Sequence, residues 1–320
     1  MSKRRVVVTG LGIVSPVGIG VATAWENILA GRSGITRITR FDASPFASHI
    51  AGEVKDFDVS KYLPVKEARR FDVFVHYGTA AAMEAIGDAG ITVTEENAER
   101  IGVNIGSGIG GLPMIEDTVK TLQESGPRRI SPFFIPGTII NMVAGNLSIM
   151  YGFKGPNLAI TTACTTSTHC IGESARLIAY GDADVMVAGG SESTVCPLAI
   201  GGFAAARALS TRNDEPELAS RPWDRQRDGF VLGEAAELVA GMAFSGEIKG
   251  FEAVPVGGKA LHIAFYGPYD KTGDAHYAMD DYLKANNLTS LSPVIEEYVT
   301  DPMTEKDPSK LLTNIYYLVK

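Results

Sequence analysis

Residues 160–170 read Ile160-Thr-Thr-Ala-Cys-Thr-Thr-Ser-Thr-His-Cys170, and this stretch decides how the neighbouring chain is expected to fold. An apolar run from Leu158 to Ala163 ends just before Cys164, and a helix-compatible stretch follows as far as Tyr180. We therefore predict a buried strand, a turn that carries Cys164, and a helix. A thiol in that place lies at a helix N-terminus, where the helix dipole favours the thiolate.

Cys164 has two interpretations on these residues alone. It is either a nucleophile, with small neighbours that admit an acyl group and N–H groups that hold an oxyanion, or a buried structural cysteine. Cys170 is expected to face the core, and Cys196 carries no signal. A metal site at Cys164, His169 and Cys170 is not predicted, because a fourth ligand and a Cys-x-x-Cys pair are missing.

Outward from this stretch, short apolar runs alternate with helical stretches. An alternation of this kind predicts an α/β fold, in layers around a mostly parallel sheet with helices on both faces. The predicted strands cover residues 5–10, 101–105, 158–163 and 184–188, and an Ala-rich helix covers 79–89.

Glycines follow the second of these strands in the spacing G-x-G-x-x-G, at Gly106, Gly108 and Gly111. A dinucleotide site would need a further strand with an acidic residue about 20 positions on, which the sequence does not offer. A phosphate-binding loop would need a Gly-Lys-Ser/Thr ending, which is also missing. The glycines instead predict a tight loop whose backbone passes close to another segment.

The composition of the chain excludes several classes of protein. The chain has 320 residues, of which 45% are hydrophobic and 21% charged, as in globular proteins. A net charge of -8 argues against nucleic-acid binding, and no apolar run is long enough to suggest a membrane span. We expect no signal peptide, and three cysteines suit a reducing cytoplasm rather than a disulfide scaffold.

The composition changes near Ala236. The last arginine is Arg227, and seven of the 11 tyrosines lie at or after Tyr266. We therefore expect two modules, 1–236 and 237–320. The second reads as a small α+β unit of the order β-α-β-β, with a strand at 259–266, a helix at 272–285 and strands at 294–300 and 314–319.

Residues 1–236 resemble the N-terminal half of the beta-ketoacyl synthase (3-oxoacyl-[acyl-carrier-protein] synthase II) family, the condensing enzymes that elongate fatty acids. The resemblance implies a thiolase-like fold, built from two similar α/β halves and usually dimeric. The stretches that carry it are MSKRRVVVTGLGIVSPVG, RIGVNIGSGIGGL, GPRRISPFFIPGTIINMVAGNLSIMYGFKGPN, TTACTTSTH, YGDADVMVAGGSE and FAAARALSTRNDEPELASRPWDRQRDGFVLGE.

The resemblance also implies roles for individual residues. Cys164 matches the acyl-accepting nucleophile, whose own N–H forms half of the oxyanion hole. Ile109 matches a residue that lines and gates the acyl tunnel, and Phe134 lies in a segment that reaches the tunnel and the dimer interface. No cofactor is implied beyond the phosphopantetheine of the acyl-carrier protein, which brings the fatty acyl thioester. The positions that match carrier-protein contacts are Lys66, Arg69, Arg70 and Arg207; for each, a solvated surface charge is the alternative.

In this family the second half supplies two catalytic histidines, a lysine and a Gly-rich loop with phenylalanine. Their expected signatures, a His-Gly-Thr-Ser-Thr run, a Lys before Gly-His and a Phe-Gly-Gly turn, do not occur in this sequence. After residue 236 the only histidines are His262 and His276, in other contexts. We therefore expect acylation of Cys164 rather than complete condensation.

Residues 237–320 resemble the C-terminal half of a GyrI-like, AraC effector-binding domain, through ELVAG, GKALHIAFYGPYDKTGDAHYAMDDYL, EEYVTDP and LLTNIYYLV. The resemblance implies a small-molecule-binding module with Glu296 or Glu297, together with Tyr298, at its ligand position, and strand alternation favours Glu296 because it shares a face with Tyr298. An exposed strand carboxylate is the alternative. The chain then reads as a chimera of two half-domains. It is either a fusion whose halves cover their apolar faces by packing or dimerising, or an engineered or recombined hybrid without an evolved function.

Overall fold

The computed structural model describes residues 4–244, 260–268, 271–298, 300, 305 and 307–319. It divides into two compact units, Met1–Gly246 and Glu247–Lys320, and each is described here by itself. The division lies beyond the seam expected at Ala236, because strand β8, Ala235–Phe244, is hydrogen-bonded on both sides within the first unit.

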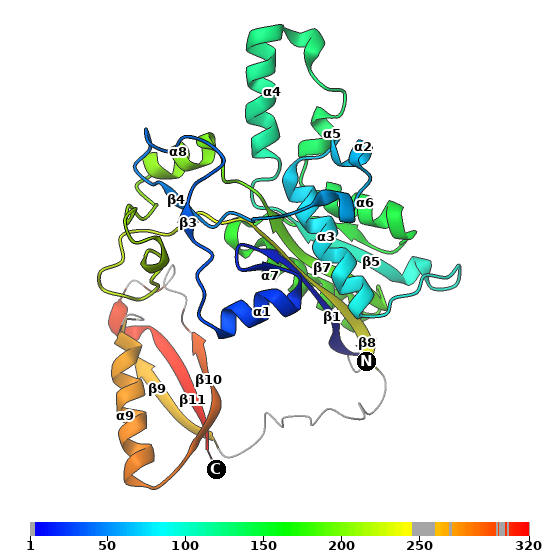
Figure 1. Cartoon of the computed structure of the whole chain (residues 1–320). Coiled ribbons are helices and arrows are strands. Elements are labelled where there is room, and N and C mark those ends of the chain that lie inside the picture. The colour runs from blue at the N-terminus through cyan, green and yellow to red at the C-terminus, as the bar shows by residue number, and fades with distance from the viewer. Residues whose placement is uncertain are drawn as a thin grey trace. The chain divides into compact units, whose positions relative to one another are not determined.

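Unit 1 is built on a six-stranded sheet of order β2-β1-β8-β7-β5-β6 (Figure 1). Its strands are β1 Arg5–Ser15, β2 Gly18–Ile19, β5 Ile101–Gly106, β6 Asn157–Leu158, β7 Val185–Glu192 and β8. The sheet is mixed, which corrects the prediction of mostly parallel pairing: β5 pairs in parallel with β6 and β7, whereas β8 is antiparallel to both β1 and β7. The chain re-enters the sheet opposite the end of β7, where Ala235 pairs with Glu192, so β8 must run back.

Helices cover both faces of this sheet. A Cβ on Gly12 of β1 would lie 1.9 Å from the carbonyl oxygen of Ala81 in α3, so only glycine lets that helix pack so closely. The preceding residue, Leu11, lines a hollow on the opposite face together with Ser167 of α7 and Trp25 of α1. The helices concerned are α1 Val21–Leu29, α3 Val73–Asp88, α6 Met142–Tyr151 and α7 Thr166–Tyr180.

Several of the remaining elements of unit 1 follow the carboxyl ends of β5 and β7, whereas η2 directly precedes β5. Helix α4 stands out from the body in Figure 1, with α2 and α5 near its base. These elements are β3 Thr36–Arg37, β4 Ile50–Ala51, α2 Val65–Ala68, α4 Leu112–Ser125, α5 Phe134–Thr138, α8 Pro197–Ala205 and the short 3-10 helices η1 Val59–Lys61, η2 Ala98–Arg100, η3 Pro127–Arg129, η4 Ala163–Thr165 and η5 Pro216–Leu218.

The predicted buried strand at 158–163 is wrong. Only Asn157–Leu158 pair with β5, and both residues are exposed at the edge of the sheet. The chain then crosses the end of β5: a Cβ on Gly106 would lie 1.9 Å from the carbonyl oxygen of Ile160. The apolar run therefore passes over the strand end and delivers the turn with Cys164 there.

Unit 2 contains β9 Ala260–Tyr266, α9 Thr272–Ala285, β10 Ser290–Tyr298, the 3-10 helix η7 Pro308–Lys310 and β11 Leu312–Val319, with an antiparallel sheet of order β10-β11-β9. Its core contains Ala275, Met279, Leu283, Ile315 and Tyr317. In the strand register Glu296 lies opposite Ile315 and Tyr298 opposite Thr313, but the side chains of Glu296 and Tyr298 lie outside the described residues. Among the helices that the structure describes, none has the length and apolar character to cross a bilayer.

Candidate functional site

Cys164 is exposed on the 3-10 turn that leads directly into α7. The turn is held by its threonines: the Thr162 N–H donates to Thr166 Oγ1 at 2.9 Å, and Thr165 Oγ1 donates to the Thr162 carbonyl oxygen at 2.8 Å. Ala163 has a φ of 54°, a left-handed conformation that costs a residue with a Cβ free energy. The packing of the turn thus presents the thiol to solvent at the helix N-terminus.

The other two cysteines are buried. Cys170 lies on α7 with no exposed surface, and burial raises the pKa of its thiol. Cys196 precedes α8, and burial raises its pKa to about 11. Their thiols therefore have little thiolate near neutral pH, in addition to lacking access.

The Gly-rich loop at residues 106–111 lies against the Cys164 turn. A Cβ on Gly108 would lie 3.3 Å from the carbonyl oxygen of Ala163, and one on Gly106 would lie 2.6 Å from Cγ2 of Thr166. These contacts show why the strand end is glycine-rich: side chains would push the loop away from the turn. Ile109, for which the family resemblance implies a place at an acyl tunnel, is 42% exposed within this loop.

Glu192, at the end of β7, is a residue that sequence reasoning missed. Its Oε1 accepts from Ser107 Oγ at 2.9 Å and from the Gly110 N–H at 3.2 Å, while Oε2 accepts from the Ile109 N–H at 2.9 Å. Burial raises the pKa of Glu192, and the hydrogen bonds from Ser107, Ile109 and Gly110 work against that shift. The available signal was an acidic residue two positions after the pair of glycines that follows the apolar run.

Asp72 fixes the other end of the same loop. Its carboxylate accepts from the Phe74 N–H at 3.3 Å, as the N-cap of α3, and from the Met114 N–H in the first turn of α4 at 2.8 Å. A Cβ on Gly111 would lie 3.1 Å from Cβ of Asp72. Burial raises the pKa of Asp72 to about 6, although both N–H groups stabilise its charge.

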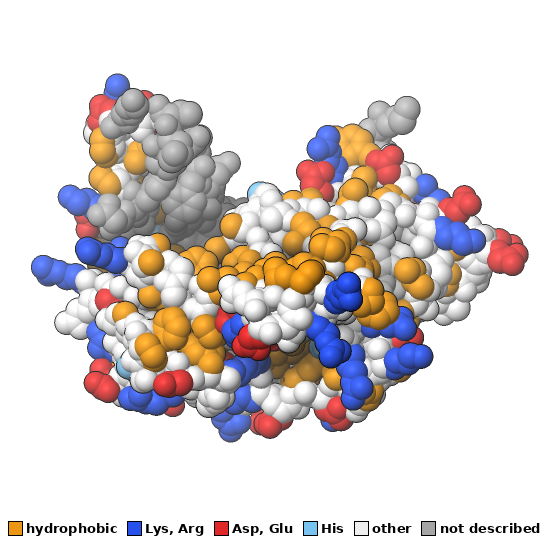
Figure 2. All heavy atoms as spheres, turned by 90° about the horizontal axis from the view of Figure 1, so that it is seen from above, with side chains coloured by type: hydrophobic (Ala, Val, Ile, Leu, Met, Phe, Trp, Pro, Cys, Tyr) orange, Lys and Arg blue, Asp and Glu red, His pale blue; other side chains and the backbone are white. Residues whose placement is uncertain are grey.

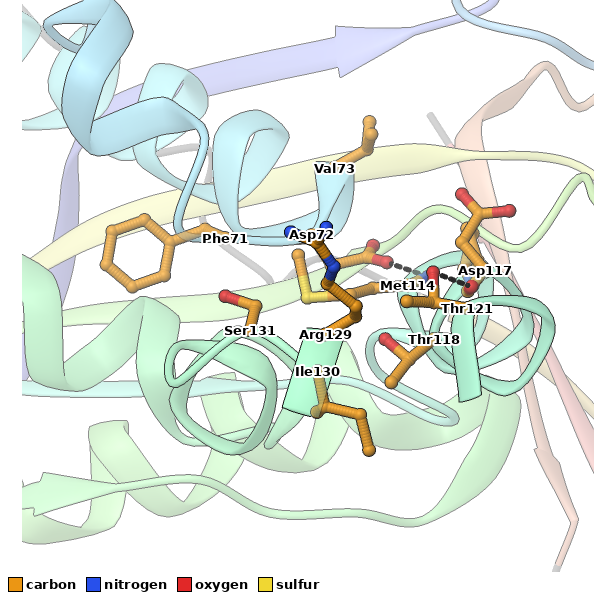
Figure 3. Close-up of a pocket in the computed structure, with 11 residues that line it drawn as sticks. Phe71, Asp72, Val73, Met114, Asp117, Thr118, Thr121, Arg129, Ile130 and Ser131 are labelled. Atoms are coloured by element: carbon orange, nitrogen blue, oxygen red, sulfur yellow. Dashed lines mark hydrogen bonds between the residues drawn. The ribbon is translucent and has the colours of Figure 1, made fainter. Parts of the chain in front are cut away.

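Asp72 also lines a groove of about 280 Å³, which Figure 3 shows between the start of α3, helix α4 and the η3 segment. Phe71 and Met114 give the groove apolar walls, and Arg129 enters it from η3. Arg129 was also missed from the sequence, where Arg128-Arg129 stand as a basic pair after Gly-Pro. The groove is thus lined both by the positive side chain of Arg129 and by Phe71, the residue that follows Arg70.

The sequence-predicted residues do not all gather at one place. Lys66 and Arg69 are exposed on and after α2, and the Arg70 guanidinium lies 4.7 Å above the ring of Phe133. Arg207 is exposed just after α8, a different element.

Phe134, at the start of α5, is only partly exposed. Helix α5 ends against the Gly-rich loop, because the Gly111 N–H donates to the Thr138 carbonyl oxygen at 3.0 Å. The structure therefore brings together Cys164, the loop of Ile109 and the helix of Phe134.

His169 is exposed one turn into α7, and its Nδ1 lies 2.7 Å from Thr162 Oγ1. Among the described residues no group of three or more His, Cys, Asp or Glu side chains is arranged to hold a metal ion.

Comparison with known families identifies this arrangement. The family model described as "Beta-ketoacyl synthase, N-terminal domain" matches residues 3–240. The chain belongs to this family. The beta-ketoacyl synthase match includes the Cys164 turn, the Gly-rich loop, Glu192 and the first half of β8.

Two relatives share the name 3-oxoacyl-[acyl-carrier-protein] synthase 2. The protein of Vibrio harveyi is 54% identical over 277 residues, which cover 87% of this chain and 65% of that protein. The protein of Coxiella burnetii is 60% identical over 239 residues, which cover 75% of this chain and 58% of that protein. The chain therefore spans less than two thirds of the length of these relatives.

Solved structures give the same fold. A beta-ketoacyl synthase from Burkholderia phymatum matches with a TM-score of 0.67 at 30% identity, over 75% of this chain and 59% of that chain. A type II PKS ketosynthase, solved in complex with its acyl-carrier protein, matches with a TM-score of 0.67 at 30% identity, over 76% and 59%. The thiolase-like ketosynthase fold is confirmed, with a mixed sheet.

Proposed function

We propose that unit 1 performs the acyl-transfer step of a condensing enzyme in fatty acid elongation. The Cys164 sulfur attacks the thioester carbonyl of an acyl chain on phosphopantetheine, a new thioester forms at Cys164, and the phosphopantetheine thiol leaves with the proton. N–H groups of the turn hold the developing oxyanion. The observation that carries this proposal is the exposed Cys164 at the N-terminus of α7, within the family match.

The proposal stops at acyl transfer. Decarboxylative condensation develops an enolate-like charge that needs further hydrogen-bond donors or acids. The described residues around Cys164 supply the thiol and the N–H groups of the turn, which suffice for the acyl-enzyme. The transfer uses no cofactor other than the phosphopantetheine of the substrate.

Mass spectrometry after incubation with a fatty acyl-carrier-protein thioester tests this function. We expect an acyl adduct on the peptide that contains Cys164, and covalent capture of the same thiol by the epoxide cerulenin. Cys164→Ala should abolish both, whereas Cys170→Ala, at the buried neighbour on α7, should keep both. Folded protein that forms neither adduct would refute the proposal.

The proposed substrate carrier is an acidic acyl-carrier protein. Support comes from the exposed basic residues around α2, from the Arg129 groove beside them, and from the structure of the related ketosynthase with its carrier. On the face shown in Figure 2, hydrophobic side chains gather near the centre with Lys and Arg side chains next to them. Such a mixture suits a carrier that presents acidic residues around a lipid-bearing arm.

Charge reversal tests the carrier site. The double variant Lys66→Glu, Arg69→Glu should weaken carrier-protein binding about tenfold at low salt, with a smaller loss at high salt. Reversing Arg207 as well should add to the loss. The control reverses the exposed Arg32 and Arg176, which lie on other elements, and should bind like the original chain.

We also propose a homodimer formed through the α5 and α6 region. Its support is the group of exposed apolar side chains there: Ile135 is 61% exposed and Ile149 is 81% exposed. Light scattering at micromolar concentration should give twice the chain mass, and Ile135→Lys with Ile149→Lys should return it to a single chain. A monomer before substitution would contradict this proposal.

For residues 237–320 we retain the GyrI-like small-molecule module as the second candidate, with residues 1–236 as the synthase half of a chimera. Its support is the strand-helix-strand-strand order with a core of its own. It predicts saturable binding of an amphipathic ligand that Glu296→Gln weakens. A hybrid chain without function predicts neither this binding nor acylation of Cys164.

A further inference from the structure

Both oxygens of the Glu192 carboxylate accept hydrogen bonds from the Gly-rich loop at residues 106–111. Oε2 accepts from the Ile109 N–H at 2.9 Å, and Oε1 accepts from Ser107 Oγ and from the Gly110 N–H. The Gly110 N–H also donates to Ser107 Oγ at 2.9 Å, which closes a small network. A carboxylate can accept all of these bonds, whereas an amide presents one oxygen and an N–H₂ donor.

This loop forms the wall next to the reactive turn. Gly108 packs against the carbonyl of Ala163, the residue before Cys164, and Gly110 lies near Thr138 at the end of α5. The loop therefore separates the Cys164 turn from α5, with Ile109 at its exposed tip. A residue that holds this Gly-rich loop in place therefore also sets the space beside the Cys164 sulfur.

We propose that Glu192 is a positioning residue that holds Ile109 against the Cys164 turn and so limits the length of acyl chain that Cys164 accepts. Glu192 does not touch the reacting atoms; it acts through the N–H groups of Ile109 and Gly110. Asp72 supports it by holding the Met114 end of the loop. The inference rests on the proposed acyl transfer, and it adds a residue that controls chain length.

The test compares Glu192→Gln with the original chain. Acylation of Cys164 is followed by mass spectrometry with butanoyl and dodecanoyl pantetheine thioesters, and alkylation by iodoacetamide measures the thiol itself. The long-to-short ratio of acylation rates should rise about tenfold, because an amide cannot keep the loop closed. Iodoacetamide should react within about twofold of the original rate, since the turn of Cys164 is untouched.

Glu53→Gln is the matched control. Glu53 is a buried carboxylate that, like Glu192, accepts backbone N–H groups, but from Thr39 and Arg40 on another loop. Its variant should leave the chain-length ratio unchanged. An equal loss of all three rates in Glu192→Gln, or an unchanged ratio, would overturn the positioning role.

A second readout separates this inference from the proposed function. If iodoacetamide reacts at Cys164 but no thioester does, acyl transfer is refuted while the loop remains testable by amide hydrogen exchange. Glu192→Gln should then speed exchange at Ile109 and Gly110 about tenfold, since their acceptor is lost. Unchanged exchange at both amides would reject the positioning role.

Discussion

At the scale of single residues, the three cysteines differ in access and in pKa. Iodoacetamide near neutral pH should modify Cys164 at least about a hundredfold faster than Cys170 or Cys196. The reason is that Cys164 is exposed, whereas burial protects the other two thiols and raises their pKa values. Peptide mass spectrometry over a time course measures the rates, and in denaturant all three should react alike. Equal labelling in the native protein would mean that the Cys164 turn is not presented as described.

Asp72 should make the stability of unit 1 fall with rising pH. Its folded pKa is about 6, above the ordinary 3.8, so its protonated form is favoured by folding. The stability it contributes is complete below about pH 4 and is lost as the pH rises through about 6, by at most about 3 kcal/mol. Urea unfolding followed by tryptophan fluorescence measures it, because Trp25 and Trp223 both lie in unit 1. In Asp72→Asn this fall should disappear; a fall as steep as the original would contradict the assignment.

Asp184 should make the stability of unit 1 rise with rising pH, the opposite of the effect of Asp72. Hydrogen bonds from Arg100 and Arg4 lower its pKa to about 2. A lowered folded pKa gives stability that is present above about pH 4 and is lost as the pH falls through about 2. Asp184→Asn should therefore destabilise unit 1 at neutral pH and flatten the acid limb of its unfolding curve. A variant as stable as the original at neutral pH would show that the two arginines add nothing.

At the scale of elements, the contact of β1 with α3 depends on glycine. Gly12→Ala places a methyl group 1.9 Å from the Ala81 carbonyl oxygen and should cost about 3 kcal/mol of unfolding free energy or more, since backbone must move. Gly87→Ala, in α3 itself, meets no atom within 4 Å and should stabilise by up to about 1 kcal/mol. Urea midpoints measure both variants. A Gly12→Ala protein of ordinary stability would mean that the helix packs further away.

The sequence predicted helices and strands correctly where a short run of neighbouring residues carried the pattern. The strand at 101–105, the helix after Cys164 and the strand at 184–188 are confirmed as β5, α7 and β7 within a few residues. The strand at 158–163 was wrong because the run pairs with β5 only at Leu158, at the exposed edge of the sheet, and then passes over Gly106 instead of continuing the strand.

At the scale of the whole molecule, the features that the sequence hid are those made by distant segments. Strand β8 lies between β1 and β7, and its pairing partners are more than 40 residues away in sequence, so no local signal marked the sheet as mixed. The candidate site also depends on contacts between segments that are distant in sequence. Cys164 and the Gly-rich loop are visible as motifs, but Glu192 and Asp72 gain meaning only when folding brings them to that loop. The charge and spacing of a lone acidic residue give no indication of which amides it will accept.

Each unit has its own core, so a core defect in unit 2 should stay there. Met279 is 4% exposed and packs with Leu283 and Ile315 between α9 and the small sheet. Met279→Ala should cost about 2 to 5 kcal/mol, enough to unfold a unit of this size. Hydrogen exchange of the α9 amides should then become fast, while the urea midpoint from tryptophan fluorescence stays unchanged because both tryptophans report on unit 1. A matched fall of that midpoint would show that the two units fold as one, since unit 1 keeps its own core in this variant.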